Sequence, residues 1–128
     1  MLVDSTIADE FLATYKGVLA LVNGVVVPQG IKEFVECREL LYSDLESIAE
    51  CTNIPEDFRD ALSRSIYGEF IFLKKYKKWY ALQHMESSKY YAVLALTSPI
   101  ETMVEDFSVI EIALVPYKGH IVCDGLIV

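Results

Sequence analysis

The feature that most constrains the fold is a change of pattern near Ile66. Before this residue, apolar side chains recur at intervals of three and four, whereas after it aromatic and β-branched residues form short runs separated by turns. The first pattern is typical of amphipathic helices and the second of strands. Because the two patterns are segregated along the chain, the sequence predicts an α+β fold, in which a helical N-terminal half packs on a β sheet.

The chain is long enough for one complete hydrophobic core. It has 128 residues, of which 53% are apolar. A domain of this size buries roughly two thirds of its unfolded surface and needs no disulfide or metal to do so. The apolar fraction also excludes intrinsic disorder. We therefore expect one α+β domain over residues 1–128, mainly helical over 1–66 and mainly β over 67–128.

The helical half is divided by residues that stop or start helices. Asp4, Ser5 or Thr6 can cap a first helix, and Asn23-Gly24 ends it, because both residues tolerate the left-handed conformation common at helix ends. The segment 25–28 is β-branched and ends in Pro, so we expect a short extended link. Helical spacing from Ile31 to Ala49 predicts one helix, or two with a cap at Ser43 and Asp44. Pro55 begins a last helix that extends toward Ile66.

The second half predicts an antiparallel meander or small barrel of about five strands. The links between the apolar runs are short, which favours antiparallel pairing of consecutive strands. A short helix is expected from Ile100 to about Val104, after Thr97-Ser98-Pro99. The expected strands are Phe70–Leu73, Trp79–Leu82, Tyr90–Leu96, Val109–Val115 and His120–Cys123.

The formal net charge of -8 is unevenly distributed. Residues 1–67 hold 12 acids and 5 bases, residues 68–89 hold 2 acids and 5 bases, and residues 90–128 hold 5 acids and 1 base. An acidic surface repels phosphate, so we expect no dedicated nucleic-acid binding. It attracts basic partners instead, which favours a protein partner.

One hairpin is basic on this acidic chain. We name it the basic hairpin, and it consists of Lys74, Lys75, Tyr76, Lys77, Lys78 and Trp79. Lysines beside aromatic faces are suited to a nucleic acid or another anionic ligand, which they would contact weakly. Alternatively, the lysines keep two aromatic strands soluble and discourage pairing at the sheet edge.

The usual signatures of catalysis, metals and nucleotide cofactors are missing from the sequence. His84 and His120 are isolated, and His120 and Cys123 would point to opposite faces of a strand. There is no glycine-rich phosphate loop and no nucleophile elbow, so we expect no metal and no cofactor, and we identify no catalytic residue. A Cys-His pair formed in space among Cys37, Cys51, Cys123 and the two histidines stays open.

The compartment is also predicted from residue usage. Three cysteines without close spacing are typical of reduced thiols, and Met1-Leu-Val-Asp4 lacks the basic start of a signal peptide. The longest apolar stretch, Val18 to Val27, is about half the roughly 20 residues that a membrane helix needs. We therefore expect a cytoplasmic protein with no membrane contact.

The C-terminal segment carries a recurring motif. Pro116, Tyr117, Lys118, Gly119, Ile121, Asp124, Gly125 and Leu126 match the pattern Pro-Phe/Tyr-Lys-Gly/Asp-x-Ile-x-x-Asp-Gly-Leu. In this the chain resembles small uncharacterised bacterial proteins, in which the pattern follows a strand and closes the domain. The resemblance implies a bacterial source and carries no activity. Some of these relatives have a cysteine-rich metal motif nearby, which this sequence lacks.

The motif has a structural and a functional interpretation. As a structural element, Asp124 accepts a hydrogen bond from a backbone amide two residues on, and Gly125 supplies a positive φ. As a functional element, Tyr117, Lys118, His120 and Asp124 form the wall of a polar groove.

Three hypotheses for function follow. The first is a non-enzymatic module that binds another protein or a second copy of itself. The second is weak contact of the basic hairpin with a nucleic acid or an anionic ligand. The third is a small ligand-binding or hydrolytic domain whose site in the sheet is lined by Tyr80, His84, Tyr90 and Tyr91.

Overall fold

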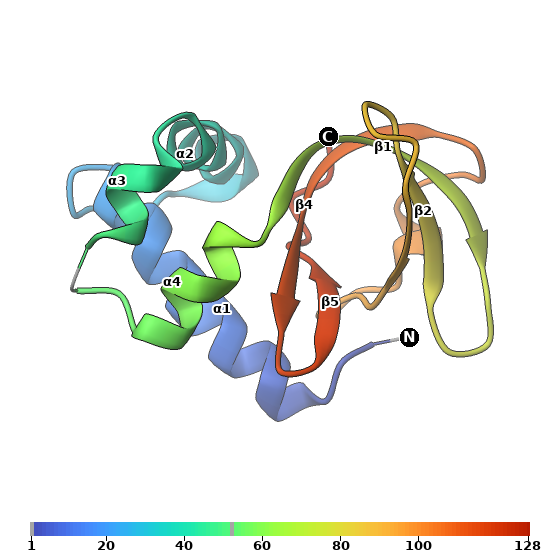
Figure 1. Cartoon of the computed structure of the whole chain (residues 1–128), viewed down its shortest axis with the longest axis horizontal. Coiled ribbons are helices and arrows are strands. Elements are labelled where there is room, and N and C mark those ends of the chain that lie inside the picture. The colour runs from blue at the N-terminus through green and yellow to red at the C-terminus, as the bar shows by residue number, and fades with distance from the viewer. Residues whose placement is uncertain (1, 52) are drawn as a thin grey trace.

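The structure of the chain is a computed structural model that describes residues 2–51 and 53–128. It confirms the α+β fold, with helices in the N-terminal half and a curled, antiparallel five-stranded sheet in the C-terminal half (Figure 1). The helices are α1 (Ser5–Val22), α2 (Gly30–Ser43), α3 (Leu45–Ala49), α4 (Glu56–Ser63) and the short 3-10 helix η1 (Ile100–Thr102). The strands are β1 (Ile66–Lys75), β2 (Tyr80–His84), β3 (Tyr90–Val93), β4 (Val109–Tyr117) and β5 (His120–Cys123).

A side-chain cap begins α1, and a change of backbone conformation ends it. The Asp4 side chain accepts a hydrogen bond from the Thr6 amide at 2.9 Å, which is the predicted cap. At the other end, Asn23 has a φ of -96°, so it is not the left-handed residue that we expected. That conformation is adopted by Gly24 and Val25, with φ angles of 70° and 66°.

Of the two alternatives for the segment from Ile31 to Ala49, the structure has two helices. The break falls at Asp44, whose φ of -141° and ψ of 47° interrupt the helical path between α2 and α3. The last helix, α4, is shorter than expected, because Ile66 already begins β1 and pairs with Leu114 of β4.

The sheet has the order β3-β2-β1-β4-β5, and all of these neighbours are antiparallel. β1 is longer than predicted, so it can pair with both β2 and β4. β3 is shorter, because Leu94 leaves it and forms an isolated parallel bridge with Val122 of β5. The Leu94 amide donates to the Ile121 carbonyl at 2.9 Å, and the Cys123 amide donates to the Leu94 carbonyl at 3.0 Å. The sheet therefore curls until its two edges meet at one end.

Two hydrophobic clusters share strand β4. Ile110, Ile112 and Leu114 point into the curl of the sheet, where they pack with Phe70, Phe72 and Leu82 among others. Val115 and Tyr117 belong to the other cluster, with side chains from α1, α2 and α4. Because side chains alternate along a strand, β4 is buried on both faces and links the helical half to the sheet.

Among the described residues, no helix is long and apolar enough to cross a bilayer.

Candidate functional site

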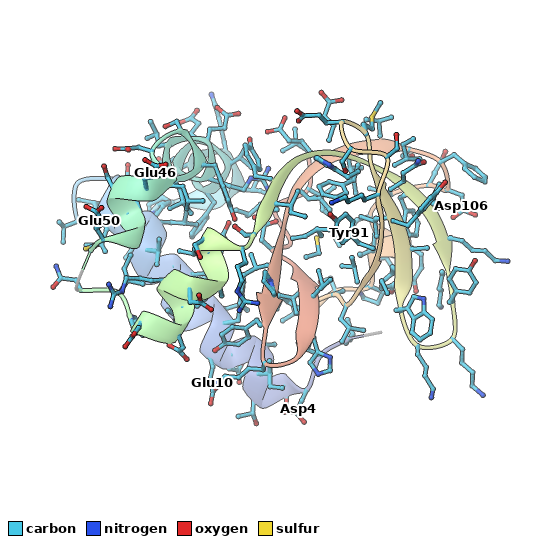
Figure 2. The ribbon with its side chains drawn as sticks, viewed as in Figure 1. Asp4, Glu10, Glu46, Glu50, Tyr91 and Asp106 are labelled. Carbon is cyan, nitrogen blue, oxygen red and sulfur yellow. The ribbon has the colours of Figure 1, made fainter. Side chains whose placement is uncertain are left out.

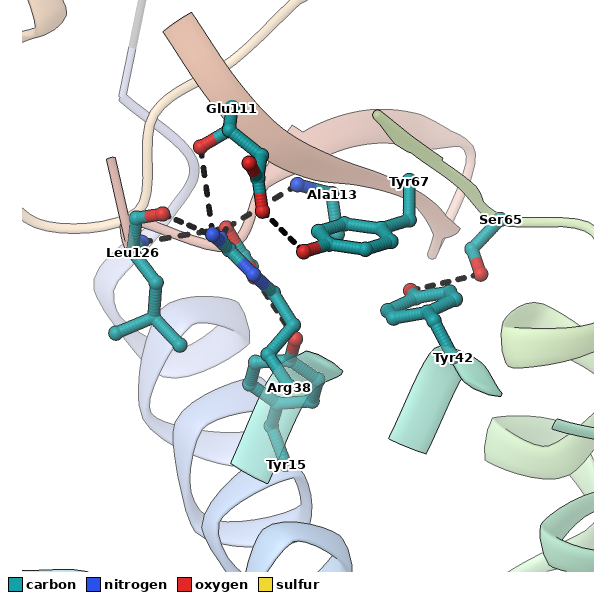
Figure 3. Close-up of polar contacts among 9 residues, drawn as sticks. Tyr15, Arg38, Tyr42, Ser65, Tyr67, Glu111, Ala113 and Leu126 are labelled. Carbon is teal, nitrogen blue, oxygen red and sulfur yellow. Dashed lines mark hydrogen bonds and ion pairs between the residues drawn. The ribbon is translucent and has the colours of Figure 1, made fainter. Parts of the chain in front are cut away.

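Asp124 of the C-terminal motif lies at the centre of a buried polar network that joins the helices to the sheet. Figure 3 shows its partners Tyr15, Arg38 and Leu126. Arg38 of α2 places its Nη1 atom 3.1 Å from both carboxylate oxygens. The Tyr15 hydroxyl of α1 donates to Oδ2 at 2.8 Å, and the Leu126 amide donates to Oδ1 at 3.2 Å. The predicted bond from the amide two residues on is therefore present, and Gly125 has the predicted positive φ of 80°.

The charges of this pair are fully enclosed. Both side chains have 0% exposure. Burial raises the pKa of Asp124, and the Arg38 guanidinium and the Tyr15 hydroxyl oppose that rise. Burial lowers the pKa of Arg38, but the neighbouring carboxylate outweighs it, so the guanidinium stays charged. A buried charge without its partner is very unfavourable, so each side chain depends on the other.

Aromatic side chains enclose the guanidinium. The Tyr67 ring lies 5.1 Å from the Arg38 Cζ atom and stacks on Tyr42, with ring centroids 4.8 Å apart. The Tyr67 hydroxyl donates to the Glu111 carboxylate, and the Tyr42 hydroxyl donates to Ser65 at 2.8 Å. Most polar groups of the network are bonded to one another, so the network stabilises the structure; Arg38 Nε has no hydrogen-bond partner among the described residues, and Tyr67 and Glu111 also line a surface cavity.

The structure separates the four residues of the predicted polar groove. Tyr117, Lys118 and His120 line a shallow surface cavity of about 270 Å³ near the β4–β5 turn. Asp124 is buried and does not line that cavity. Lys118 is exposed, with its Nζ atom 4.0 Å from Asp57 of α4.

Cys37 and Cys123 lie in environments unsuited to a thiolate nucleophile. Burial raises the pKa of Cys37 and raises that of Cys123 to about 12. His120 is exposed and Cys123 buried, on opposite faces of β5 as their spacing predicted. All three cysteines are free, and among the described residues no group of three or more His, Cys, Asp or Glu side chains is placed to hold a metal.

The residues proposed for a site in the sheet lie in four different environments. Tyr80 is buried in the sheet cluster and bonds Glu101, Tyr91 is half-buried against that cluster, and Tyr90 is 69% exposed. His84 lines an open cavity of about 540 Å³ with Tyr67, Gly68, Glu69, Met85, Glu86 and Glu111. Its Nδ1 atom lies 2.8 Å from the Ser87 hydroxyl, which fixes the ring. These four residues do not surround one common cavity.

The basic hairpin lies between β1 and β2 as predicted, but Lys74 and Lys75 belong to the end of β1, and the connection itself is Tyr76 to Trp79. Its four lysines and two aromatic side chains are all exposed. Lys75 pairs with Glu101 at 3.1 Å, and the Lys74 Nζ atom lies 5.4 Å from the Tyr76 ring centroid. The hairpin projects from the sheet at the end of the molecule away from α2 and α3 (Figure 1).

A second exposed surface was not singled out from the sequence. Val25, Val26 and Val27, which we name the valine loop, connect α1 to α2 and are 77%, 60% and 52% exposed. Ile31, in the first turn of α2, is 62% exposed. The only signal in the sequence was a run of three β-branched residues, which a short buried link would show equally.

The valine loop is held in one conformation by its own hydrogen bonds. The Val25 amide donates to the Ala20 carbonyl at 2.8 Å, and the Asn23 side chain donates to the Val26 carbonyl at 2.9 Å. The Gln29 side chain donates to the Val27 carbonyl at 3.3 Å. Val25 has a φ of 66°, a genuine outlier for a β-branched residue.

Acidic side chains follow this loop in the sequence. The Glu33 carboxylate accepts a hydrogen bond from the Gln29 amide at 2.7 Å, so it lies beside the end of the loop. Figure 2 shows Glu46 of α3 and Glu50, which follows α3, pointing outward from the helical half. Between residues 23 and 50, Lys32 is the single exposed base of the described segment, because Arg38 is buried. The exposed acids of this segment are Glu33, Glu36, Glu39, Asp44, Glu46 and Glu50.

Comparison of the chain with protein-family models, with curated proteins and with solved structures gave no match.

Proposed function

We propose that this chain is a non-enzymatic protein-interaction module of the bacterial cytoplasm, and that its docking surface is the valine loop with the adjoining exposed face of α2. The observation that carries the proposal is Val25, an exposed β-branched residue with a positive φ. Such a conformation costs about 1–3 kcal/mol and is typically retained where function requires it. The Val25 side chain is 77% exposed and belongs to neither hydrophobic cluster of the described residues.

The chemistry of the surface specifies the kind of partner. Three valines and Ile31 offer an apolar contact, and an apolar surface rimmed by polar groups marks an interaction site. The six acids between residues 23 and 50 favour a basic partner and would accelerate its association. The partner is therefore a protein with an apolar segment flanked by lysines or arginines.

The same charges disfavour a second copy of the chain at this surface. A symmetric contact would place the acids of one copy against those of the other, and like charges in close contact cost free energy. A homodimer through the valine loop in size-exclusion chromatography with light scattering would contradict the proposed partner class.

The test is a pull-down from a native lysate at low and at moderate salt, with three forms of the chain. The wild type is expected to retain a stoichiometric protein with a basic surface. The variant V25S/V26S/V27S should lose that protein. The control Y90S/M103S/V109S removes three exposed apolar side chains from the sheet half, none of them at a positive φ, and should keep it.

Two outcomes would count against the proposal. One is that the wild type retains no stoichiometric partner at either salt. The other is that the valine variant keeps the partner. Thermal melting of all three forms establishes that each is folded.

A further inference from the structure

The basic hairpin carries aromatic and cationic groups that the proposed docking surface does not use. Its loop is short, because the Tyr76 amide donates to the Trp79 carbonyl at 2.9 Å. This bond places the two aromatic residues opposite each other, with ring centroids 6.4 Å apart and an angle of 39° between the planes. The side chains are 47% and 44% exposed, so both rings are accessible to a ligand.

The lysines of the hairpin differ in their availability. Lys75 is paired with Glu101, whose pKa is held below its ordinary value by the Tyr80 hydroxyl and by Lys75 itself. Lys77 and Lys78 lie at the centre of the loop and are exposed. Within the described part of the chain, Lys74, Lys77 and Lys78 form no ion pair, so three cations are available beside the two rings.

We propose that the basic hairpin binds single-stranded nucleic acid, with bases stacked on Tyr76 and Trp79 and phosphates contacted by Lys74, Lys77 and Lys78. Aromatic side chains combined with lysines are the elements by which proteins bind unpaired strands without sequence preference. Bases within a duplex are stacked on one another, so their faces are not available to these rings.

The acidic remainder of the molecule does not prevent this contact. Figure 1 shows the tip of the β1–β2 hairpin at the end of the molecule opposite α2 and α3. At physiological salt, charges separated by more than about 8 Å are largely screened. With three phosphate contacts, the affinity falls in the nonspecific range of roughly 10⁻⁴ to 10⁻⁶ M.

The arrangement favours a nucleic acid over a membrane surface. Lys77 and Lys78 form the tip of the loop, whereas the two aromatic residues stand on its sides. Inserting the rings into a bilayer would therefore bury the two ammonium groups first, which is unfavourable.

The test uses the emission of Trp79, the one tryptophan of the chain. Titration with unlabelled oligo(dT) should quench this emission as a base stacks on the indole. In parallel, anisotropy of fluorescein-labelled oligo(dT) should give a dissociation constant in the range above. The logarithm of the association constant, plotted against the logarithm of the salt concentration, should have a slope of about -2, because each of the three phosphate contacts on a single strand contributes about -0.7.

Matched variants separate stacking from charge. Y76L and W79L keep an apolar side chain but should each weaken binding roughly tenfold or more. K74Q/K77Q/K78Q should abolish binding, whereas K16Q/K32Q/K89Q, with the same change in net charge, should leave it unchanged. Because V25S/V26S/V27S should also bind oligo(dT) like the wild type, failure of the proposed docking surface is distinguishable from failure of this site.

Four results would overturn the inference. These are equal affinity for a duplex of the same length, an unchanged Trp79 emission, a similar loss of binding in the control lysine variant, and full binding by both leucine variants. A blue shift of the Trp79 emission with vesicles that contain phosphatidylserine, without quenching by oligo(dT), would identify a membrane ligand instead.

Discussion

The Asp124 carboxylate connects the helical half of the molecule to the sheet half. It receives hydrogen bonds from Tyr15 of α1, Arg38 of α2 and the backbone amide of Leu126. We expect D124N to lower the free energy of unfolding by about 3–5 kcal/mol, because it leaves the Arg38 charge buried without its counterion. Thermal and urea unfolding measure this loss.

Two controls accompany this prediction. K118A changes an exposed lysine of the same motif and should alter stability by less than about 0.5 kcal/mol. The double variant R38M/D124L removes both charges and should be more stable than D124N. If K118A proved as harmful as D124N, the motif would stabilise the protein through its exposed turn and not through the buried pair.

At Val25, we expect one substitution to raise stability and to weaken binding of the partner. Glycine adopts a positive φ without strain, so V25G should raise the free energy of unfolding by about 1 kcal/mol. The same variant loses an exposed apolar side chain and should retain less of the partner in the pull-down. V26G, at a position without a positive φ, should not be stabilised, and a stabilising effect equal to that of V25G would contradict the strain argument.

Tyr67 and Tyr80 predict how stability responds to alkaline pH. Burial, and next the hydrogen bonds to Glu111 and Glu101, raise the pKa of each phenol to about 12. In the unfolded chain the pKa is about 10. Their contribution is therefore complete below pH 10 and is lost as pH rises toward 12. Urea unfolding between pH 8 and pH 12 checks this, and Y80F should show a weaker dependence.

At the scale of secondary-structure elements, the helix and strand types were predictable but their ends were less so. The spacing of Phe11, Tyr15, Val18 and Leu19 identified the buried face of α1, and the structure confirms that these side chains are buried. The length of β1 was not predictable, because Ile66 is assigned to the sheet by pairing with Leu114, 48 residues further along the chain.

The pairing of Arg38 with Asp124 could not be predicted from the sequence, for the same reason. Arg38 stood among glutamates on α2, and local spacing cannot tell that its partner is 86 residues away. One signal was available: Arg38 follows the buried Cys37 and precedes the buried Leu41 by three residues, so it falls on the apolar face of its helix. The basic hairpin, by contrast, was predictable because its lysines and aromatic residues are contiguous.

The bridge between Leu94 and β5 gives a prediction for the sheet. L94P removes the amide that donates to Ile121, leaves that carbonyl without its bond, and frees the edge of β5. The free energy of unfolding should fall by about 1–3 kcal/mol. An exposed edge also pairs with other chains, so light scattering should show self-association that increases with concentration. L94A keeps the amide and should stay monomeric; association of both variants would attribute the effect to the lost side chain.

For the whole molecule, the separation of charge is the dominant property. The acids lie mainly in the helical half, and the basic hairpin lies at the opposite end of the molecule. Mutual repulsion among the acids destabilises the folded state, and salt screens it. Raising NaCl from about 20 to about 200 mM should therefore raise Tm by roughly a few degrees. E36Q/E46Q/E50Q should show a smaller rise, and an equal rise would assign the effect to something other than these acids.

Because β4 is buried on both of its faces, the helical half and the sheet half should not fold as separate fragments. A cut in the exposed turn before β1 would place Tyr15 and Arg38 on one fragment and Asp124 on the other. Each fragment would keep an apolar surface that only the other one covers. Two pieces expressed separately should therefore recover the native fold only when they associate. The Arg38–Asp124 ion pair would then form across the interface between them.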